Sequence, residues 1–251
     1  MIFVAAGTED ARFFVEKLIK KKFKLYVSTF SQYGATLYNM EKTNIRFGKM
    51  DLEEMHSFIK EIGAKCILDL SHPYAEVVSI NLIEISKRLN IPYLRYERPS
   101  YVWKDAIWMS SYKEASDYLV NSNKKALLTI GSKELESFQN VPKENLIIRV
   151  LPTESVLGKV EKLGYLPKQI IAMQGPFSKK FNKLVLEEKN IDILVTKESG
   201  KVGGFKEKVE ACIETNTILL CIKRPTIDYP FIVDNEADLI KFLESRVKKY
   251  V

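Results

Sequence analysis

A charged, glycine-rich segment in the second half of the sequence has the composition of a ligand-binding loop. It reads Lys197-Glu198-Ser199-Gly200-Lys201-Val202-Gly203-Gly204, after an apolar stretch and before a predicted helix. Three glycines in five positions allow unusual backbone angles and let a ligand approach the main chain closely. The spacing of a P-loop, G-x-x-x-x-G-K-[ST], is absent, so the pattern predicts binding without naming the ligand.

Two other loops of the second half join an apolar stretch to a predicted helix. They read Thr129-Ile130-Gly131-Ser132-Lys133 and Gln174-Gly175-Pro176-Phe177-Ser178. Small residues, backbone amides and a hydroxyl at a helix N-terminus suit a pyrophosphate or a carboxylate, although a simple helix cap has the same composition. Gly7 and Thr8 follow the first apolar stretch in the same way, without the full G-x-G-x-x-G fingerprint.

The first half carries further polar residues at the expected strand ends. His72 and Tyr74 follow a predicted strand that closes on Asp69 and Leu70, and a histidine there could donate hydrogen bonds or protons near neutral pH. Arg95 and Arg98 could hold carboxylates or phosphates, or could be neutralised by Glu97 between them.

The loop that begins at Ser28 has hydroxyl and amide side chains where an NAD-specific loop often has an acid. A 2′-phosphate would therefore meet no repulsion there. An ordinary polar loop has the same composition.

Alternating strands and helices must position these loops. Strands are predicted at residues 2–6, 24–28, 66–70, 92–96, 127–130, 146–150, 170–173, 193–196 and 218–222. Helices are predicted at 9–22, 51–62, 74–89, 133–138, 153–163, 178–188, 205–215 and 236–249. This alternation predicts parallel β-α-β units in two doubly wound lobes, 1–100 and 101–251, that face a central cleft. The boundary is soft, and strands near it could cross between lobes.

Composition narrows the class of protein. No apolar run approaches the roughly 18–20 residues of a membrane-spanning helix, and the N-terminus has no basic region of a signal peptide. Cys66, Cys212 and Cys221 lack CxxC spacing, which predicts a reducing, cytoplasmic location. Two histidines are too few for a zinc site, so no metal is expected. The net charge of +7 favours an anionic partner or simply a solvated basic surface.

Several of these loops match one known family in the family's own order. The matching pieces are Gly7-Thr8-Glu9, Ser71-His72-Pro73-Tyr74-Ala75, Tyr93-Leu94-Arg95 with Glu97-Arg98-Pro99, Thr129-Ile130-Gly131-Ser132-Lys133, Gly175-Pro176-Phe177-Ser178 with Asn182, Lys197-Glu198-Ser199-Gly200 with Gly203-Gly204 and Lys208, and Arg224-Pro225. Together they resemble the precorrin-6A reductase family, including its cobalt-precorrin-6A members, over nearly the whole chain.

The resemblance implies two Rossmann-like lobes and the reduction of one macrocycle double bond by hydride from NADPH or NADH in cobalamin biosynthesis. Members often carry Gly-Gly-Thr in the first loop and Gly-Arg after the second strand. Here these read Ala6-Gly7-Thr8 and Gly34-Ala35, so both cofactors stay open. It also leaves open a metal-free or a cobalt-containing tetrapyrrole substrate, and a monomer or a small homo-oligomer.

On this interpretation the candidate residues fall into three groups. His72 and Tyr74 contact substrate or deliver a proton, unless water does so. Arg95, Arg98 and Lys208, with Lys197 beside them, bind the carboxylates of the macrocycle. The cofactor contacts are Gly7, Thr8, Ser28, Gly131, Ser132, Gly175, Pro176, Phe177, Ser178, Lys197, Glu198, Ser199, Gly200, Gly203 and Gly204.

Two other functions fit parts of the sequence. A tetrapyrrole synthase with two similar lobes would act without nicotinamide. A basic nucleic-acid-binding protein would show steeply salt-dependent affinity, although no recognition helix or aromatic-basic platform stands out. Neither a nucleic acid nor a membrane is therefore expected as a partner.

Overall fold

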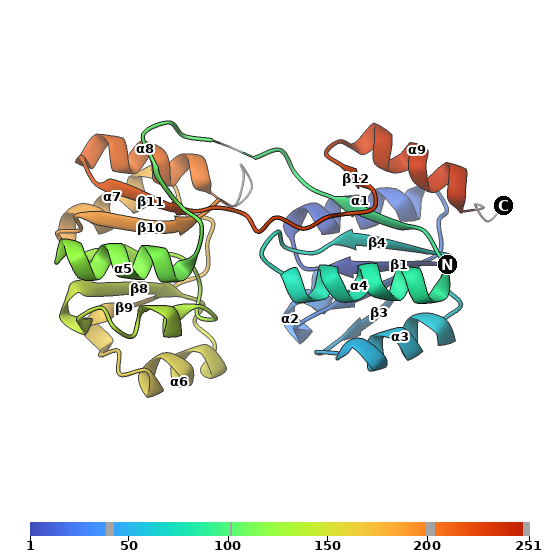
Figure 1. The fold of residues 1–251 in the computed structure, drawn as a ribbon, viewed down its shortest axis with the longest axis horizontal. Coiled ribbons are helices and arrows are strands. Elements are labelled where there is room, and N and C mark those ends of the chain that lie inside the picture. Colours follow the sequence, from blue (N-terminus) through green and yellow to red (C-terminus); the bar gives the residue numbers. More distant parts are fainter. Residues whose placement is uncertain (39–42, 101, 199–203, 248–251) are drawn as a thin grey trace. The chain divides into compact units, whose positions relative to one another are not determined.

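The computed structural model describes residues 1–38, 43–100, 102–198 and 204–247, whose strands form two six-stranded sheets. The chain divides into two compact units (Figure 1). Unit 1 contains residues 1–99 together with the described part of the C-terminal segment, 225–247. Unit 2 is the continuous segment Ser100–Arg224. Every strand pairing in both sheets is parallel, which confirms the predicted α/β class.

The sheet of unit 1 has the order β12-β5-β4-β1-β2-β3. Its strands are β1 (Ile2–Ala6), β2 (Leu25–Thr29), β3 (Asn44–Phe47), β4 (Cys66–Leu70), β5 (Tyr93–Tyr96) and β12 (Ile232–Val233). Read from β3, this is the order 3-2-1-4-5-6 of a dinucleotide-binding fold, with β12 as the sixth strand. The helices are α1 (Glu9–Lys20), α2 (Gln32–Thr36), α3 (Leu52–Glu61), α4 (Glu76–Leu89) and α9 (Glu236–Arg246).

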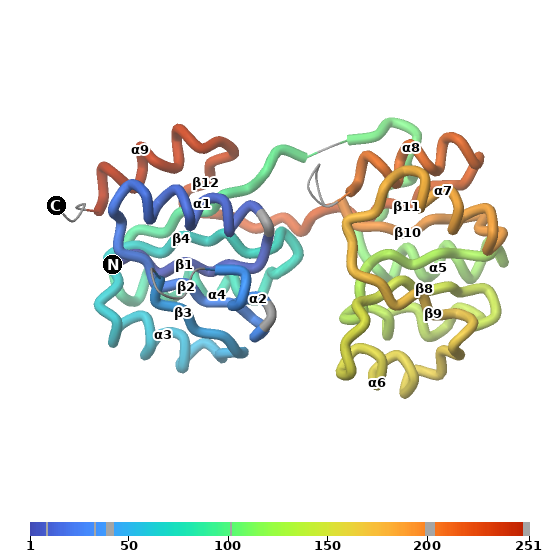
Figure 2. The backbone as a smooth tube through the Cα atoms, turned by 180° about the vertical axis from the view of Figure 1, so that it is seen from behind, coloured from blue at the N-terminus to red at the C-terminus, as the bar shows by residue number. Residues whose placement is uncertain are grey.

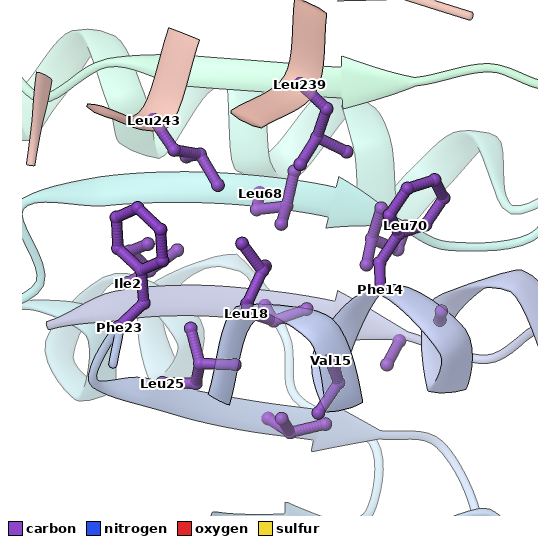
Figure 3. Packing of buried hydrophobic residues seen from close by; sticks show 14 of the residues in the cluster. Ile2, Phe14, Val15, Leu18, Phe23, Leu25, Leu68, Leu70, Leu239 and Leu243 are labelled. Atoms are coloured by element: carbon purple, nitrogen blue, oxygen red, sulfur yellow. The ribbon is translucent and has the colours of Figure 1, made fainter. Parts of the chain in front are cut away.

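Alternate residues of β1 build two apolar layers, because successive side chains of a strand point to opposite faces. Ile2 and Val4 pack with Phe14 and Leu18 of α1, as well as with Leu239 and Leu243 of α9 (Figure 3). Phe3 and Ala5 face the other way, toward Met55 and Ile59 of α3 and Leu82 of α4. Both faces of the sheet are therefore covered, as a parallel sheet requires.

The sheet of unit 2 has the order β6-β11-β10-β7-β8-β9. Its strands are β6 (Ile107–Met109), β7 (Ala126–Leu128), β8 (Leu146–Val150), β9 (Ile170–Ala172), β10 (Ile193–Lys197) and β11 (Ile218–Ile222). Its helices are α5 (Tyr112–Ser122), α6 (Glu154–Lys162), α7 (Lys179–Glu188) and α8 (Phe205–Thr215). Helices α7 and α8 pack on one face through Val185, Phe205 and Val209, and the tube in Figure 2 shows them side by side.

The C-terminal segment lies with the first unit, whereas the sequence assigned residues 225–251 to the second lobe. Pairing explains this correction: β12 extends the sheet of unit 1 beside β5, with Ile232 opposite Arg95 and Val233 opposite Tyr96. The apolar side of α9 then closes the layer over β1 and β4. The strand that joins the first unit from the far end of the chain is thus β12, which the sequence did not predict.

Other differences concern short elements. The predicted helix at 133–138 is one turn of 3₁₀-helix, Leu135–Phe138, followed by a second short turn, Lys143–Asn145. The sequence missed β3, β6 and β12, which have two to four residues, as well as α2 and α5. Within the described ranges, no helix combines the length and the apolar character needed to cross a bilayer.

Candidate functional site

The strand order of unit 2 reverses between β7 and β10. From β7 the chain continues to β8 and β9 on one side, and from β10 it continues to β11 on the other. In open α/β sheets such a reversal leaves a crevice beyond the carboxyl ends of the strands, where ligands bind. The loops after β7, β9 and β10 are the three that the sequence singled out in this half.

A cavity of about 300 Å³ lies at this edge of the sheet. Its wall comes from the ends of β7 and β8, the loop after β9, and the beginnings of α7 and α8. The lining residues are Thr129, Gly131, Arg149, Val150, Leu151, Met173, Gly175, Pro176, Phe177, Asn182, Gly204 and Lys208. Its volume is at the lower end of the about 300–1,000 Å³ that is usual for small-molecule sites.

Arg149 is a buried cation in this wall. It belongs to the apolar strand β8, and only 6% of the residue is exposed. Burial lowers the pKa of its guanidinium to about 10. Within the described part of the chain no carboxylate forms an ion pair with it; its Nη1 donates to Asn182 Oδ1 at 2.8 Å. A buried guanidinium held by a neutral amide is costly unless an anion joins it.

Lys208 is a second buried cation in the same wall, on the first turns of α8, with 8% exposure. Burial, and then the neighbouring charge of Arg149, lower the pKa of its ammonium group to about 8. Strongly shifted cations that share a cavity are typical of functional sites. The wall of the cavity is therefore electropositive.

Phe177 and Asn182 hold the Arg149 guanidinium in place. The guanidinium lies 4.2 Å from the centroid of the Phe177 ring, a cation–π distance. Asn182 is almost fully buried, and its Nδ2 donates to Ser178 O at 3.0 Å and to Phe177 O at 3.4 Å. One amide thus ties the loop after β9 to the arginine of β8.

Replacing Asn182 with alanine should therefore release both the loop and the guanidinium. We expect Asn182→Ala to lower the free energy of unfolding by about 1–3 kcal/mol. Urea unfolding measures this effect. An unchanged urea midpoint would contradict this positioning role.

The structure brings six of the predicted residues to this one cavity: Gly131, Gly175, Pro176, Phe177, Gly204 and Lys208. Ser132, Ser178, Lys197 and Glu198 do not line it. Ser178 instead caps α7 by accepting from Phe181 N at 3.2 Å, and Glu198 forms a buried ion pair with Arg224. Ser199, Gly200 and Gly203 lie outside the described residues.

Gly131 has a backbone conformation that an L-residue adopts only with strain, since its φ is +81°. An added Cβ would meet no atom within 4 Å, so strain is the only expected cost. We expect Gly131→Ala to lower the free energy of unfolding by about 1–2 kcal/mol. Gly7→Ala is the matched control, because Gly7 has neither a positive φ nor a neighbour within 4 Å of an added Cβ. Equal urea midpoints for the two variants would refute this account.

In unit 1 the corresponding reversal lies between β1 and β4. It brings the predicted first loop together with the predicted histidine loop, as the hydrogen bond from Thr8 Oγ1 to Leu70 O at 3.4 Å shows. Thr8 also caps α1 by accepting from Ala11 N at 3.1 Å. Gly7 is exposed at this edge, and Ser28 is half-buried near the end of β2.

His72 and Tyr74 are partly exposed neighbours, with ring centroids 5.6 Å apart. The backbone N–H of Tyr74 donates to His72 Nδ1 at 3.3 Å. A neutral ring that accepts at Nδ1 carries its proton at Nε2, and that atom could donate to a ligand. The role of His72 and Tyr74 toward a substrate stays a prediction.

Arg95 differs from the prediction of a substrate-binding group. Only 1% of it is exposed, and its guanidinium contacts Asp69 at 3.0 Å and Glu97 at 2.8 Å. Nη1 also donates to the Ser71 carbonyl oxygen at 2.9 Å. Burial lowers the pKa of Arg95, but the charges of Asp69 and Glu97 outweigh burial and raise it overall. Arg95 thus holds the loop that carries His72.

Arg98 also has an acidic partner within unit 1. Its Nη2 contacts Asp10 Oδ2 at 3.0 Å. The sequence allowed Glu97 to neutralise one of the two arginines, and the structure shows this pairing with Arg95. Arg95 and Arg98 are therefore each compensated by a nearby acid, in contrast with Arg149 in unit 2.

Comparison with known proteins adds to this geometry. Residues 1–244 match the model of a family described as precorrin-6x reductase CbiJ/CobK. The chain is 33% identical to the cobalt-precorrin-6A reductase of Priestia megaterium, with 99% of this chain and 100% of that protein covered. It is 35% identical to the protein of the same name from Methanococcus maripaludis, covering 97% and 99%.

A relative with a different name and a solved structure are more distant. The precorrin-6A reductase of a Sinorhizobium species is 23% identical, over 92% of this chain and 88% of its own. A solved structure of CobK precorrin-6A reductase superposes with a TM-score of 0.81 at 20% identity, covering 98% and 96% of the two chains. The solved structure confirms the arrangement of two parallel sheets.

Proposed function

The chain belongs to the precorrin-6x reductase family CbiJ/CobK, and on this basis we propose that it reduces one macrocycle double bond of cobalt-precorrin-6A with a nicotinamide dinucleotide. The match over residues 1–244 is the observation that carries this proposal. It makes the chain an oxidoreductase and argues against the synthase and nucleic-acid alternatives.

The cobalt-containing substrate is favoured by the relatives. Proteins named cobalt-precorrin-6A reductase share 33% and 35% identity with nearly the whole chain, whereas a protein named for the metal-free compound shares 23%. In this proposal cobalt is part of the substrate and needs no protein ligands.

The cavity of unit 2 suits the phosphate-bearing part of a nicotinamide dinucleotide, because the whole molecule is larger than its volume of about 300 Å³. It lies at the reversal of strand order, it is electropositive, and Leu151 and Met173 add large apolar side chains, about half-exposed, to its wall. The dinucleotide, when bound, supplies the hydride. We propose that Gly131, Gly175 and Gly204 let its phosphates approach the main chain. Both NADH and NADPH remain candidates.

The residues of unit 1 would serve the substrate side. A carbon that receives a hydride leaves charge on its neighbour, which must take a proton. We propose that the protonated, imidazolium form of His72 delivers it and becomes the neutral imidazole, whose Nδ1 then accepts from the Tyr74 backbone N–H. Arg98 is the cation of this unit that remains a candidate for the macrocycle's carboxylates. We place the reaction in the cytoplasm, since Cys66, Cys212 and Cys221 are free, buried thiols.

The direct test is an anaerobic assay with the full chain. Cobalt-precorrin-6A and metal-free precorrin-6A are each incubated with NADH or NADPH, and the tetrapyrrole and nicotinamide spectra are followed together. We expect stoichiometric oxidation of the nucleotide with the cobalt substrate. No spectral change in any of the four combinations would refute the proposal, and turnover without nucleotide would favour a synthase.

A further inference from the structure

Arg149 and Lys208 concentrate positive charge in one small cavity. They come from different elements, strand β8 and helix α8, and each is more than nine-tenths buried. The folded chain thus desolvates two like charges at one cavity, and for Arg149 the neutral amide of Asn182 does not compensate the charge. Such an arrangement is expected where an anion with more than one negative charge binds.

The guanidinium is also oriented before any ligand arrives. Phe177 covers it at 4.2 Å, and Asn182 accepts one of its N–H groups at 2.8 Å. This hydrogen bond fixes the plane of the guanidinium group. The remaining N–H donors of the guanidinium are part of a side chain that lines the cavity. A guanidinium that is already oriented can bind two oxygens of a phosphate or a carboxylate.

Phosphate fits better than the carboxylates of a macrocycle. Those carboxylates are single charges spread around a wide ring, whereas two cations at one point match one group of higher charge. The main chain supports this choice, because Gly131, Gly175 and Gly204 line the same cavity and the N-terminus of α8 lies there. Helix N-termini and glycine-containing loops bind phosphates through their N–H groups.

We propose that Arg149 and Lys208 together bind a phosphate group of the nicotinamide dinucleotide. This assignment rests on the function proposed above. It assigns Lys208 to cofactor binding, whereas the sequence predicted substrate binding for this residue. It also adds Arg149, which the sequence motifs did not identify as a binding residue.

Thermal unfolding with and without pyrophosphate separates this role from a structural one. If Lys208 served the fold alone, Lys208→Met would change the thermal midpoint of the ligand-free protein but not the rise that pyrophosphate causes. If it serves a phosphate, the variant should lose most of that rise. Lys206→Met is the matched control, since Lys206 lies on the same helix, exposed and 3.6 Å from Glu210.

Isothermal titration with inorganic pyrophosphate, NADH and NADPH measures binding without turnover. We expect Arg149→Met and Lys208→Met each to raise the Kd for pyrophosphate and for at least one nucleotide by about 10- to 100-fold. Arg149→Lys should recover part of the loss, and Lys206→Met should have no effect. A Kd that stays within twofold in both cavity variants overturns the proposal.

The two nucleotides identify which phosphate is bound. Equal losses for NADH and NADPH in Arg149→Met place the pyrophosphate at the site. A loss confined to NADPH places the 2′-phosphate there, and Arg149 then determines cofactor preference. If instead the variants raise only the KM for the tetrapyrrole, the cations bind substrate and the proposal is wrong.

The pH dependence gives an independent check. The groups facing Lys208 are Arg149 on β8, Lys197 on β10, Cys221 on β11 and Glu207 on α8. Because the pKa of Lys208 is about 8 in the ligand-free protein, affinity for NADPH, which carries both kinds of phosphate, should fall as the pH rises through 8. This fall should be absent in Lys208→Met, and its persistence there would count against the proposal.

Failure of this inference and failure of the proposed function give different results. A wild-type chain that reduces the tetrapyrrole, with both cavity variants retaining nucleotide affinity, overturns the inference alone. A chain that binds pyrophosphate through Arg149 but reduces no tetrapyrrole has a phosphate site and a different reaction. If Arg149→Met does not fold, the thermal midpoint and Kd values of Lys208→Met decide.

Discussion

Replacing Asp69 with alanine should unfold unit 1 at a much lower denaturant concentration. Asp69 is fully buried, and its two oxygens accept four hydrogen bonds. The donors are Ser71 N at 2.9 Å, Ser79 Oγ at 2.6 Å, Tyr93 Oη at 2.8 Å and Arg95 Nη1 at 3.0 Å. Without this carboxylate, Arg95 loses one of the two acids that pair with it among the described residues, and two hydroxyls lose this acceptor.

Removing one partner of a buried ion pair costs about 3–5 kcal/mol, and that is the expected loss in free energy of unfolding. Urea unfolding followed by circular dichroism measures it. Asp117→Asn is the control, because Asp117 pairs with Lys113 at 2.8 Å on the exposed surface of α5. A midpoint for Asp69→Ala that matches the control would show that the network contributes nothing.

Replacing His72 should have the largest effect on the chemical step. General acid catalysis by a positioned side chain contributes about 10²–10⁴ to a rate. We therefore expect His72→Asn to lower kcat for the tetrapyrrole about 100-fold. The Kd for the nucleotide should not change, because the proposed nucleotide cavity consists of unit 2 residues.

Tyr74→Phe is the companion variant, since it keeps the backbone N–H that His72 Nδ1 accepts. A small effect there would assign proton delivery to the imidazole. Stopped-flow single turnovers separate the chemical step from product release. A single-turnover rate for His72→Asn equal to that of the wild type would mean that water supplies the proton.

Much of the fold was predictable because its strands are short apolar runs between amphipathic helices. The bounds of β1, β4, β8, β11 and α8 agree with the expected ranges. The resemblance to the precorrin-6A reductases is confirmed as well. Pairing across long sequence separations was not predictable: β12 has two residues, and its partner β5 lies more than 100 positions earlier.

The partners of the two arginines that lie inside strands could not be predicted from the sequence. Arg95 and Arg149 both interrupt an apolar strand, and both are buried. Their difference lies in distant residues: Asp69, on the neighbouring strand, compensates Arg95, whereas Arg149 has Asn182 from α7. A charged residue inside a strand covered on both faces was a usable signal for Arg149, because it requires a partner. The identity of that partner is set by tertiary structure.

The discontinuity of unit 1 has a consequence for the order of events on the ribosome. Unit 2 is one continuous segment, so all of its strands are synthesised before residue 225 emerges. Unit 1 must wait for β12 and α9, and until then the apolar side of β1 and β4 lacks Leu239 and Leu243. Nascent chains usually fold their N-terminal domain first. Here the continuous unit 2 can reach its native structure while unit 1 is still incomplete and its apolar layer over β1 and β4 is exposed.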